Sequence, residues 1–454
     1  MQPMQIVIFG ITGDLAKRKL LPALYNLNIN DQLPENLEIY GISRSQVNID
    51  HLFESVKKHL PNKYDKKSLN DIKNKLILKK LDLDNIDAYI ALRSDIEQNH
   101  SLKSHRLYYL SIPSQAFKQI VINLGKARHN EAFDNESTLP KLLVEKPFGH
   151  DLKSAKELIK TTNKYFKECQ VFRIDHYLAK ETAQNIMTFR FYNPIFESIW
   201  NSNYIESISI SALEKIGIEG RSNFYEKTGA LRDVIQSHLF QLLSLVTMER
   251  PLNFNSDEIH RSKQRLIDSI SIINPDEVWE NTLRAQYIGY KDEAGNKNSR
   301  IETYAKINLL INNQQWRNTK IFLEAGKALH EKYTKIHVKF KSLNENDGIN
   351  CLIFRLQPNE GISIELQAKK PGTSNDIETV EMNFDYSSTF NNRSAEAYER
   401  VISDAIKGDQ SLFASNKEVI ATWSIIQNVL DQWSKTNKKL IHYPIGSNIN
   451  KLIN

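Results

Sequence analysis

Cysteine is scarce in this sequence, since only Cys169 and Cys351 occur among 454 residues. Two cysteines are too few for a disulfide framework, and no Cys/His spacing is typical of a zinc site. We expect both thiols to pack as small apolar groups. The scarcity fits a reducing compartment, and we expect a cytoplasmic protein.

The sequence also lacks a long apolar run and a strongly basic segment. No stretch approaches the ~18 residues of a membrane span, because Gln241 and Ser244 interrupt the longest candidate, residues 239–248. The net charge is only +6, and the lysine-rich residues 57–80 also carry acids. We therefore expect no membrane and no nucleic-acid partner. A modest positive charge suits small anions such as phosphates.

Two patterns of apolar residues divide the chain, which is too long for a single core of about 250–300 residues. Up to about residue 175, short apolar runs alternate with helical patterns. This alternation predicts an α/β Rossmann domain with a doubly wound parallel sheet over residues 1–175. The apolar runs are residues 5–9, 37–41, 107–112, 141–144 and 171–174, with helical patterns over 14–27 and 151–166.

Beyond about residue 200 the apolar residues recur with a period of two. Such alternation indicates strands with one solvated face, which are typical of antiparallel sheets. We predict an α+β domain over residues 176–454 with a large, mainly antiparallel sheet. The alternating segments are residues 207–212, 301–311, 336–340 and 362–368.

A glycine-containing turn separates the first strand from the first helix. Backbone N–H groups at a helix N-terminus suit a pyrophosphate, and glycine lets the backbone approach it. Thr12 and Leu15 occupy the second and third glycine positions of G-x-G-x-x-G. A plain strand–helix turn is the alternative to a dinucleotide site. The residues assigned to that site are Gly10, Thr12, Gly13, Asp14 and Leu15.

The end of the second strand carries Arg44 between two serines, with no acid beside it. NAD sites usually place Asp or Glu at this point, whereas a guanidinium can pair with the 2′-phosphate of NADP. NADP is therefore favoured, with NAD also possible. A solvated loop arginine is the alternative interpretation.

Two further motifs follow strands, where ligands bind in such sheets. Lys146 lies in E-K-P-F-G, which could instead be a strand-terminating turn. Asp175, His176, Tyr177 and Lys180 lie in R-I-D-H-Y-L-A-K-E. If a helix follows, His176 and Lys180 share a face at i and i+4 and could grip a phosphate. A buried Asp–His pair is the structural alternative.

The segment 230–239 has a helical pattern in which His238 interrupts an apolar stripe. Such a histidine is more often a satisfied core residue. Its functional interpretation is a general base, because imidazole titrates near neutrality and can accept a hydroxyl proton. A base of this kind needs a carboxylate to orient it.

Together these segments resemble the glucose-6-phosphate dehydrogenase family in order over nearly the whole chain. R-I-D-H-Y followed by R-D-V-x-Q-x-H is highly specific, and any one short motif is not. The resemblance implies that His238 is a catalyst rather than a core residue. The matching segments are residues 10–21, 145–149, 173–181, 219–221, 229–238 and 326–331.

The resemblance implies a role for each position. His238 is the base on the C1 hydroxyl and Asp175 orients it, while His176, Tyr177 and Lys180 hold the 6-phosphate. Lys146 lies between sugar and nicotinamide. Gly10, Thr12, Gly13 and Arg44 bind the dinucleotide, and Glu214, Asp233, Lys327 and Lys332 bind the sugar.

The resemblance also implies a reaction, a pathway and an assembly. Glucose 6-phosphate is oxidised to the 6-phosphogluconolactone with NADP, as the first step of the oxidative pentose phosphate pathway. No metal is needed, and the second domain mediates a homodimer or a dimer of dimers. Another NAD(P)-dependent sugar oxidoreductase and a non-catalytic NADP-binding sensor are the rival functions.

One departure from the family pattern is Ala179, where members usually have glycine. If this turn requires a positive φ, alanine is strained there and phosphate affinity suffers. If the backbone is already helical, alanine is harmless.

Overall fold

The computed structural model describes residues 3–98, 105–132, 139–272, 278–342, 344, 348–390, 395–435 and 440–448. Two compact units divide the chain. Unit 1 consists of Met1–Gly149, Lys153–Ala179 and Ala395–Asn416, and unit 2 of His150–Leu152, Lys180–Ser394 and Lys417–Asn454. The domain boundary after residue 175 stays a prediction. The return of Ala395–Asn416 to unit 1 is not foreseen by any local pattern.

The core of unit 1 is a seven-stranded sheet in the order β16-β6-β5-β4-β1-β2-β3. Neighbouring strands are parallel, except that β16 runs antiparallel to β6. The predicted doubly wound sheet is thereby confirmed. Its strands are β1 (Met4–Phe9), β2 (Leu37–Ser43), β3 (Leu76–Lys80), β4 (His105–Leu110), β5 (Lys141–Val144), β6 (Val171–Ile174) and β16 (Phe413–Ala414).

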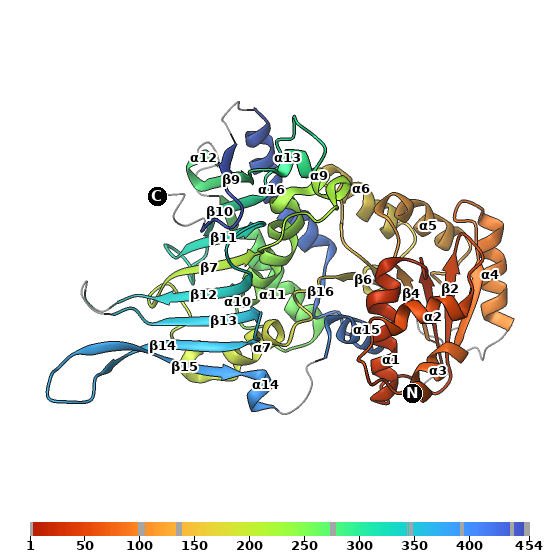
Figure 1. Ribbon diagram of the computed structural model, residues 1–454, viewed down its shortest axis with the longest axis horizontal. Coiled ribbons are helices and arrows are strands. Elements are labelled where there is room, and N and C mark those ends of the chain that lie inside the picture. Colours follow the sequence, from red (N-terminus) through yellow and green to blue (C-terminus); the bar gives the residue numbers. More distant parts are fainter. Residues whose placement is uncertain are drawn as a thin grey trace. The chain divides into compact units, whose positions relative to one another are not determined.

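Helices alternate with these strands along the chain (Figure 1). The interior strand β1 is buried along its whole length, as its mostly apolar sequence predicts. Asn48 begins α2 by accepting hydrogen bonds from the backbone N–H groups of Asp50 and His51. The helices are η1 (Ala16–Leu20), α1 (Leu21–Ile29), α2 (Ile49–Lys57), α3 (Lys66–Asn74), α4 (Ile86–Gln98), α5 (Ser114–Lys126), α6 (Leu152–Asn163), η2 (Glu168–Gln170) and α15 (Ala397–Lys407).

The returning segment completes the core of unit 1. Phe413 on β16 packs its ring edge-on against Phe172 on β6, with centroids 5.0 Å apart. Lys141 donates hydrogen bonds to the carbonyls of Ala405 and Ile406 at the end of α15, at 2.8 and 2.7 Å. Residues distant in sequence therefore share one apolar core.

Unit 2 contains a ten-stranded sheet in the order β15-β14-β13-β12-β7-β11-β10-β9-β17, with β8 paired to β10. Most neighbours are antiparallel, whereas β7 with β11 and β9 with β17 are parallel. The predicted large, mainly antiparallel sheet is confirmed. Its strands are β7 (Ile205–Leu213), β8 (Ile270–Ile272), β9 (Thr282–Tyr287), β10 (Tyr304–Ile311), β11 (Lys320–Gly326), β12 (Tyr333–Phe340), β13 (Cys351–Gln357), β14 (Gly361–Lys369), β15 (Ile377–Asp385) and β17 (Ile441–Tyr443).

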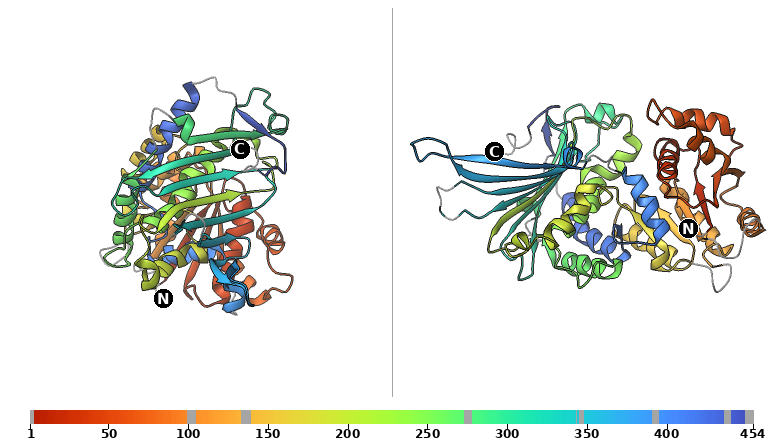
Figure 2. Two further views of the ribbon diagram at one scale, coloured as in Figure 1. Left: turned by 90° about the vertical axis from the view of Figure 1, so that its left-hand side faces the viewer. Right: turned by 90° about the horizontal axis from the view of Figure 1, so that it is seen from below.

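The longer helices of unit 2 lie on one face of this sheet, and its central strands are open on the other face (Figure 2). Burial alternates along β10 and β12, in agreement with the period of two. No helix in the described part of the chain has the length and apolarity to cross a membrane. The helices are α7 (Glu181–Phe191), α8 (Pro194–Glu197), α9 (Ser222–Ala230), η3 (Leu231–Leu239), α10 (Phe240–Thr247), α11 (Ser256–Asp268), α12 (Val278–Asn281), α13 (Tyr290–Glu293), α14 (Tyr386–Thr389) and α16 (Asn416–Lys435).

Candidate functional site

The glycine turn of unit 1 follows β1 directly. Gly10 has a φ of +82°, and a Cβ there would lie 2.1 Å from the carbonyl oxygen of Ser111, so no other residue fits. The N–H of Gly13 donates to the carbonyl of Gly10 at 2.9 Å. Thr12 is exposed, and Asp14 and Leu15 open the helix. The turn therefore presents backbone to solvent at a helix start, as a pyrophosphate site requires.

Arg44 directly follows β2, the neighbour of β1 in the parallel sheet. The carboxyl ends of these strands lie at the same sheet edge, so Arg44 and the glycine turn share that edge. Ser43 is buried and donates a hydrogen bond to the carbonyl of Ser45, while Arg44 is exposed. The residues present suit a dinucleotide that carries a 2′-phosphate.

Lys146 lies at the same edge, two residues after the end of β5, and is half-buried. The Lys146–Pro147 bond is cis. Glu145, the residue before it, accepts a hydrogen bond from the hydroxyl of Tyr109 on β4. The E-K-P segment thus fixes a carboxylate beside the lysine assigned to the sugar and nicotinamide.

Asp175 and His176 follow the end of β6. The Asp175 side chain is 3% exposed and accepts a hydrogen bond from the N–H of Tyr177 at 3.0 Å. The N–H of Leu178 donates to the Asp175 carbonyl at 3.2 Å. These bonds fold residues 175–178 into a turn.

No helix begins at His176, so the condition under which His176 and Lys180 would share a helix face is not met. Lys180 has an extended backbone, with φ −78° and ψ 142°, and α7 begins only at Glu181. The reason is the competing turn held by Asp175, because aspartate readily bonds nearby backbone N–H groups. Ala179 in this turn does not adopt a positive φ, so alanine carries no strain there.

His176 belongs to a hydrogen-bonded cluster that sequence reasoning missed. Its Nε2 lies 3.1 Å from the hydroxyl of Tyr398 on α15 and 3.4 Å from a carboxylate oxygen of Glu145. Burial and the nearby Glu145 carboxylate raise the pKa of Tyr398, so its hydroxyl keeps its proton. Glu145 stands inside a motif of interest, whereas nothing near Tyr398 in the sequence marks it.

Lys180 lies in unit 2. Its Nζ donates to the carbonyl of Leu356 at 3.4 Å and is 3.7 Å from a carboxylate oxygen of Glu360. Glu360 also accepts a hydrogen bond from the N–H of Thr182 at 3.2 Å. A carboxylate therefore holds the predicted phosphate ligand near the start of α7.

His238 lies in η3, which is a π-helix rather than the expected α-helix. The imidazole is 6% exposed, so the stripe it interrupts is indeed buried. A π-helix forms i→i+5 backbone hydrogen bonds in place of the i→i+4 bonds of an α-helix. Such segments are frequent at functional sites, which supports the functional interpretation of His238.

The structure joins two of the predicted sugar ligands, Glu214 and Lys327. Glu214 follows β7 and Lys327 follows β11, and these strands are parallel neighbours. The Lys327 ammonium contacts the Glu214 carboxylate and lies 5.7 Å from the ring centroid of Tyr225. Lys332 is exposed just before β12. Asp233 is in the first turn of η3.

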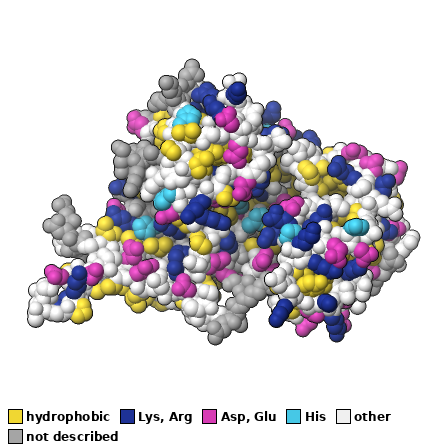
Figure 3. Space-filling model, in the orientation of Figure 1, with side chains coloured by type: hydrophobic (Ala, Val, Ile, Leu, Met, Phe, Trp, Pro, Cys, Tyr) yellow, Lys and Arg dark blue, Asp and Glu magenta, His cyan; other side chains and the backbone are white. Residues whose placement is uncertain are grey.

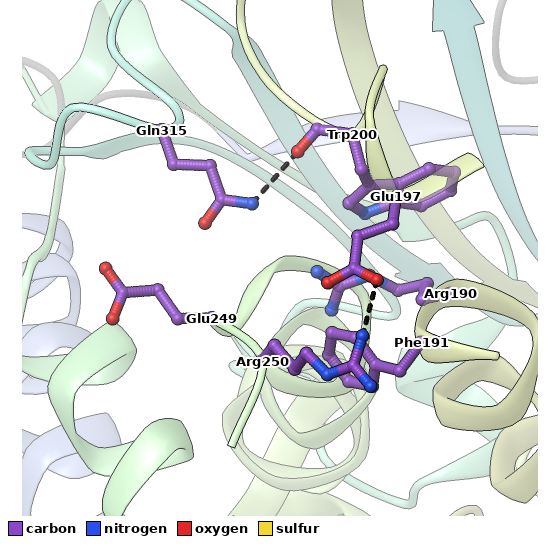
Figure 4. Close-up of a pocket in the computed structure, with 7 residues that line it drawn as sticks. All are labelled: Arg190, Phe191, Glu197, Trp200, Glu249, Arg250 and Gln315. Atoms are coloured by element: carbon purple, nitrogen blue, oxygen red, sulfur yellow. Dashed lines mark hydrogen bonds and ion pairs between the residues drawn. The ribbon is translucent and has the colours of Figure 1, made fainter. Parts of the chain in front are cut away.

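A pocket of about 160 Å³ in unit 2 includes none of these residues (Figure 4). Arg190 there donates to the carbonyls of Leu245 and Met248 at 2.7 and 2.8 Å. Trp200 donates to Val246, and Trp316 to Thr247, at 2.7 and 2.6 Å. These donors satisfy the carbonyls that α10 leaves open at its C-terminus, so this pocket is structural.

Basic and acidic side chains are interspersed over the face drawn in Figure 3. Cys351 is buried as expected, but Cys169 is exposed, which corrects the expectation for that thiol. Cys169 lies in the short helix η2 at the surface, where a single turn cannot cover it.

Comparison with known protein families agrees with this geometry. Residues 7–185 match the NAD-binding domain of glucose-6-phosphate dehydrogenase, and residues 187–452 match its C-terminal domain. The chain belongs to the glucose-6-phosphate dehydrogenase family. It is therefore an oxidoreductase of the class that acts on a CH–OH group.

Relatives of this family are similar over almost the entire chain. Glucose-6-phosphate 1-dehydrogenase of Chlamydia pneumoniae is 39% identical over 98% of this chain and 92% of its own length. A solved glucose-6-phosphate dehydrogenase in complex with glucose 6-phosphate has a TM-score of 0.91 and 33% identity, covering 98% and 95% of the two chains. The Mycobacterium avium enzyme has a TM-score of 0.84 and 31% identity, covering 98% and 94%.

Proposed function

We propose that this chain oxidises C1 of glucose 6-phosphate to 6-phosphoglucono-1,5-lactone with NADP, as the first step of the oxidative pentose phosphate pathway. The observation that carries the proposal is the buried His238 in a π-helix, within a family named for this reaction. His238 accepts the proton of the C1 hydroxyl. NADP, when bound, supplies the nicotinamide C4 that takes the hydride.

Asp175 acts as the carboxylate that favours the charged imidazole after proton transfer. This role follows from the family resemblance, and the turn around Asp175 supports it, because Asp175 is buried and its side chain is held by the backbone of Tyr177. A double-mutant cycle with Asp175→Asn and His238→Asn tests the coupling. Additive losses in kcat would contradict the role.

Substrate selection rests on the charged and polar side chains that the motifs supply. His176, Tyr177 and Lys180 bind the 6-phosphate, and the Glu145 and Tyr398 contacts fix the His176 ring. Glu214, Asp233, Lys327 and Lys332 bind the sugar hydroxyls, and Lys146 contacts sugar and nicotinamide. The paired Lys327 and Glu214 offer a donor and an acceptor side by side, which suits vicinal hydroxyls.

Cofactor binding rests on the glycine turn and Arg44. The backbone of Gly10, Thr12 and Gly13, at the start of the helix that Asp14 and Leu15 open, binds the pyrophosphate. The exposed Arg44 pairs with the 2′-phosphate, which makes NADP the preferred cofactor over NAD. We also propose that the protein is cytoplasmic and that it forms a homodimer or a dimer of dimers. Light scattering of the purified protein tests the assembly.

The deciding experiment follows the absorbance of reduced nicotinamide with glucose 6-phosphate, with free glucose as the control, and compares NADP with NAD. We expect reduction with the phosphorylated sugar alone and a preference for NADP. A folded protein that reduces neither cofactor would contradict the proposal and favour a sensor. Reduction of the cofactor with a different sugar would instead identify that sugar as the substrate.

A further inference from the structure

Three side chains with metal-ligating atoms meet on the sheet of unit 2. His337 on β12, Cys351 on β13 and Glu365 on β14 each offer one such atom, and these atoms all lie within 4.8 Å of one another. Within the described ranges, this is the one such group of three or more His, Cys, Asp or Glu residues. The dehydrogenase chemistry proposed above uses none of them.

The register of the sheet places the three residues together. β13 pairs antiparallel with both β12 and β14, and Cys351 stands directly opposite Glu365. On its other side Cys351 stands opposite Lys339, two residues from His337. Opposite residues, and residues two apart on a strand, project from the same face. The cluster is therefore built on three hydrogen-bonded strands, which are rigid elements.

The face that carries the cluster is accessible. Ile336 and Val338 on β12 are fully buried on the other face, whereas His337 and Glu365 are half-buried. Cys351 is 6% exposed and lies between them. A small ion can therefore reach the thiol past the imidazole and the carboxylate.

Imidazole, thiolate and carboxylate are the usual zinc ligands, at about 2.0–2.3 Å from the ion. Ligand atoms at those distances in a tetrahedron are roughly 3.3–3.8 Å apart. The separations of up to 4.8 Å thus need to contract by about 1 Å, which small side-chain rotations supply. One thiolate and one carboxylate balance the charge of a divalent ion.

Two lysines flank His337 on the same strand and oppose a cation. The Lys339 ammonium is 2.8 Å from a carboxylate oxygen of Glu206, and the Lys335 ammonium lies 4.3 Å from the ring centroid of Tyr333. The Glu206 carboxylate offsets part of the repulsion between Lys339 and an ion at the cluster, and the tyrosine contact holds the Lys335 ammonium at the Tyr333 ring.

We propose that His337, Cys351 and Glu365 bind a borderline-soft divalent cation, with Zn²⁺ as the best match, and that the ion ties β12, β13 and β14 together. The fourth coordination position is open to water. Neither spacing nor motif could indicate this site, because its ligands come from three strands and only the register brings them together.

Cobalt titration of the reduced, metal-free full-length protein tests the site, since thiolate bound to Co²⁺ gives a charge-transfer band in the near ultraviolet. We expect saturable binding of a single equivalent that Zn²⁺ displaces. Cys351→Ser abolishes the band, whereas Cys169→Ser, the matched control at the exposed cysteine, retains it. His337→Gln weakens binding by more than about 10–100-fold, the usual loss for an outer partner alone.

A band that survives in Cys351→Ser, or no saturable band in the parent protein, overturns the proposal. If Cys351→Ser does not fold, alkylation of the parent protein decides instead. Zn²⁺ should then slow alkylation of Cys351 and leave Cys169 unaffected, and Glu365→Gln should remove that protection. Equal alkylation rates with and without Zn²⁺ contradict the site. Both measurements are independent of dehydrogenase activity.

Discussion

The carboxylate of Glu302 accepts a hydrogen bond from the backbone N–H of Leu231, at 3.1 Å, where η3 begins. The Glu302 carbonyl also accepts one from the N–H of Ala230, at 3.1 Å. Glu302 is 3% exposed, and burial raises the pKa of its carboxyl group. A single residue from the loop before β10 thus caps the helix that carries His238.

Gly229→Ala should disturb this cap. Gly229 has a φ of +63°, and a Cβ there would lie 2.3 Å from a carboxylate oxygen of Glu302. We expect a loss of about 1–3 kcal/mol in unfolding free energy, together with a lower kcat because η3 shifts. Denaturant unfolding and steady-state kinetics measure the two effects. Gly220→Ala is the control, because Gly220 also has a positive φ but a Cβ added there would meet no other atom within 4 Å. Equal kcat losses in both variants would contradict the argument.

Glu302→Gln separates the cap from the charge. Because the pKa of Glu302 is raised in the folded state, the carboxyl group favours folding most at low pH, and this contribution falls as pH rises above 4.5, the reference value. Glutamine keeps a hydrogen-bond acceptor but carries no charge, so Glu302→Gln should change the unfolding free energy little at pH 7. Glu302→Leu should cost about 0.5–2 kcal/mol, the loss typical of a removed cap. Unfolding curves of both variants show whether Glu302→Leu is less stable than Glu302→Gln.

His238→Asn should lower kcat by roughly 10²–10⁴-fold, the usual scale for a lost general base. The KM for glucose 6-phosphate should change little, because asparagine still hydrogen-bonds. Steady-state kinetics with NADP measure both. His442→Asn, at an exposed histidine on β17, is the matched control. Unchanged turnover in His238→Asn would refute the catalytic role.

Arg44→Ala should weaken NADP selectively. Removing a charge-assisted hydrogen bond to the 2′-phosphate costs about 1.5–3 kcal/mol, which corresponds to an increase of roughly 10–200-fold in KM for NADP. The KM for NAD should stay the same. Arg317→Ala, at an exposed arginine of unit 2, is the control. An equal loss for both cofactors would show that Arg44 does not bind the 2′-phosphate.

Glu418→Gln should destabilise unit 2. Glu418 and Lys263 are both fully buried and 2.7 Å apart, and His260 lies 2.7 Å from the same carboxylate. Burial raises the pKa of Glu418, but attraction to Lys263 and the His260 hydrogen bond outweigh it and lower the pKa to about 2. Removing one partner leaves the other charge buried without compensation, which lowers the unfolding free energy by about 3–5 kcal/mol.

The pH dependence of this pair has a defined sign. Because the pKa of Glu418 is lowered in the folded state, the stabilisation by this pair is complete above about pH 4.5 and is lost as the pH falls toward 2. Urea unfolding between those values should show a steeper acid loss in the parent protein than in Glu418→Gln. The double variant Glu418→Gln/Lys263→Met should recover stability. Identical acid profiles would contradict the ion pair.

Local patterns were sufficient for some of the strands and missed others, such as β3, β11 and β13. Residues 141–144 and 171–174 were predicted with the observed bounds, because buried parallel strands are continuous apolar runs. The π-helix was not predictable, because its apolar residues have the same spacing as those of an α-helix. β16 has only two residues, and its strand character depends on pairing with β6. The sequence therefore indicated the elements better than their partners.

The candidate site shows the same limit. Motifs pointed to Asp175, His176 and His238, whose proposed roles lie in their own side chains. Tyr398 contacts His176 from 222 positions away, and Glu302 reaches Leu231 from 71 positions away. Residues that position other side chains come close to them only in the folded chain, so no local sequence pattern identifies them.

The return of Ala395–Asn416 to unit 1 bears on how this family can evolve. A gene fragment that ends before Ala395 encodes a sheet without β16 and leaves Phe172 without the ring of Phe413. The nucleotide-binding half therefore cannot be exchanged between dehydrogenases as a self-contained cassette. Recombination within the gene should preserve the fold only when the segments of unit 1, Met1–Gly149, Lys153–Ala179 and Ala395–Asn416, come from the same parent.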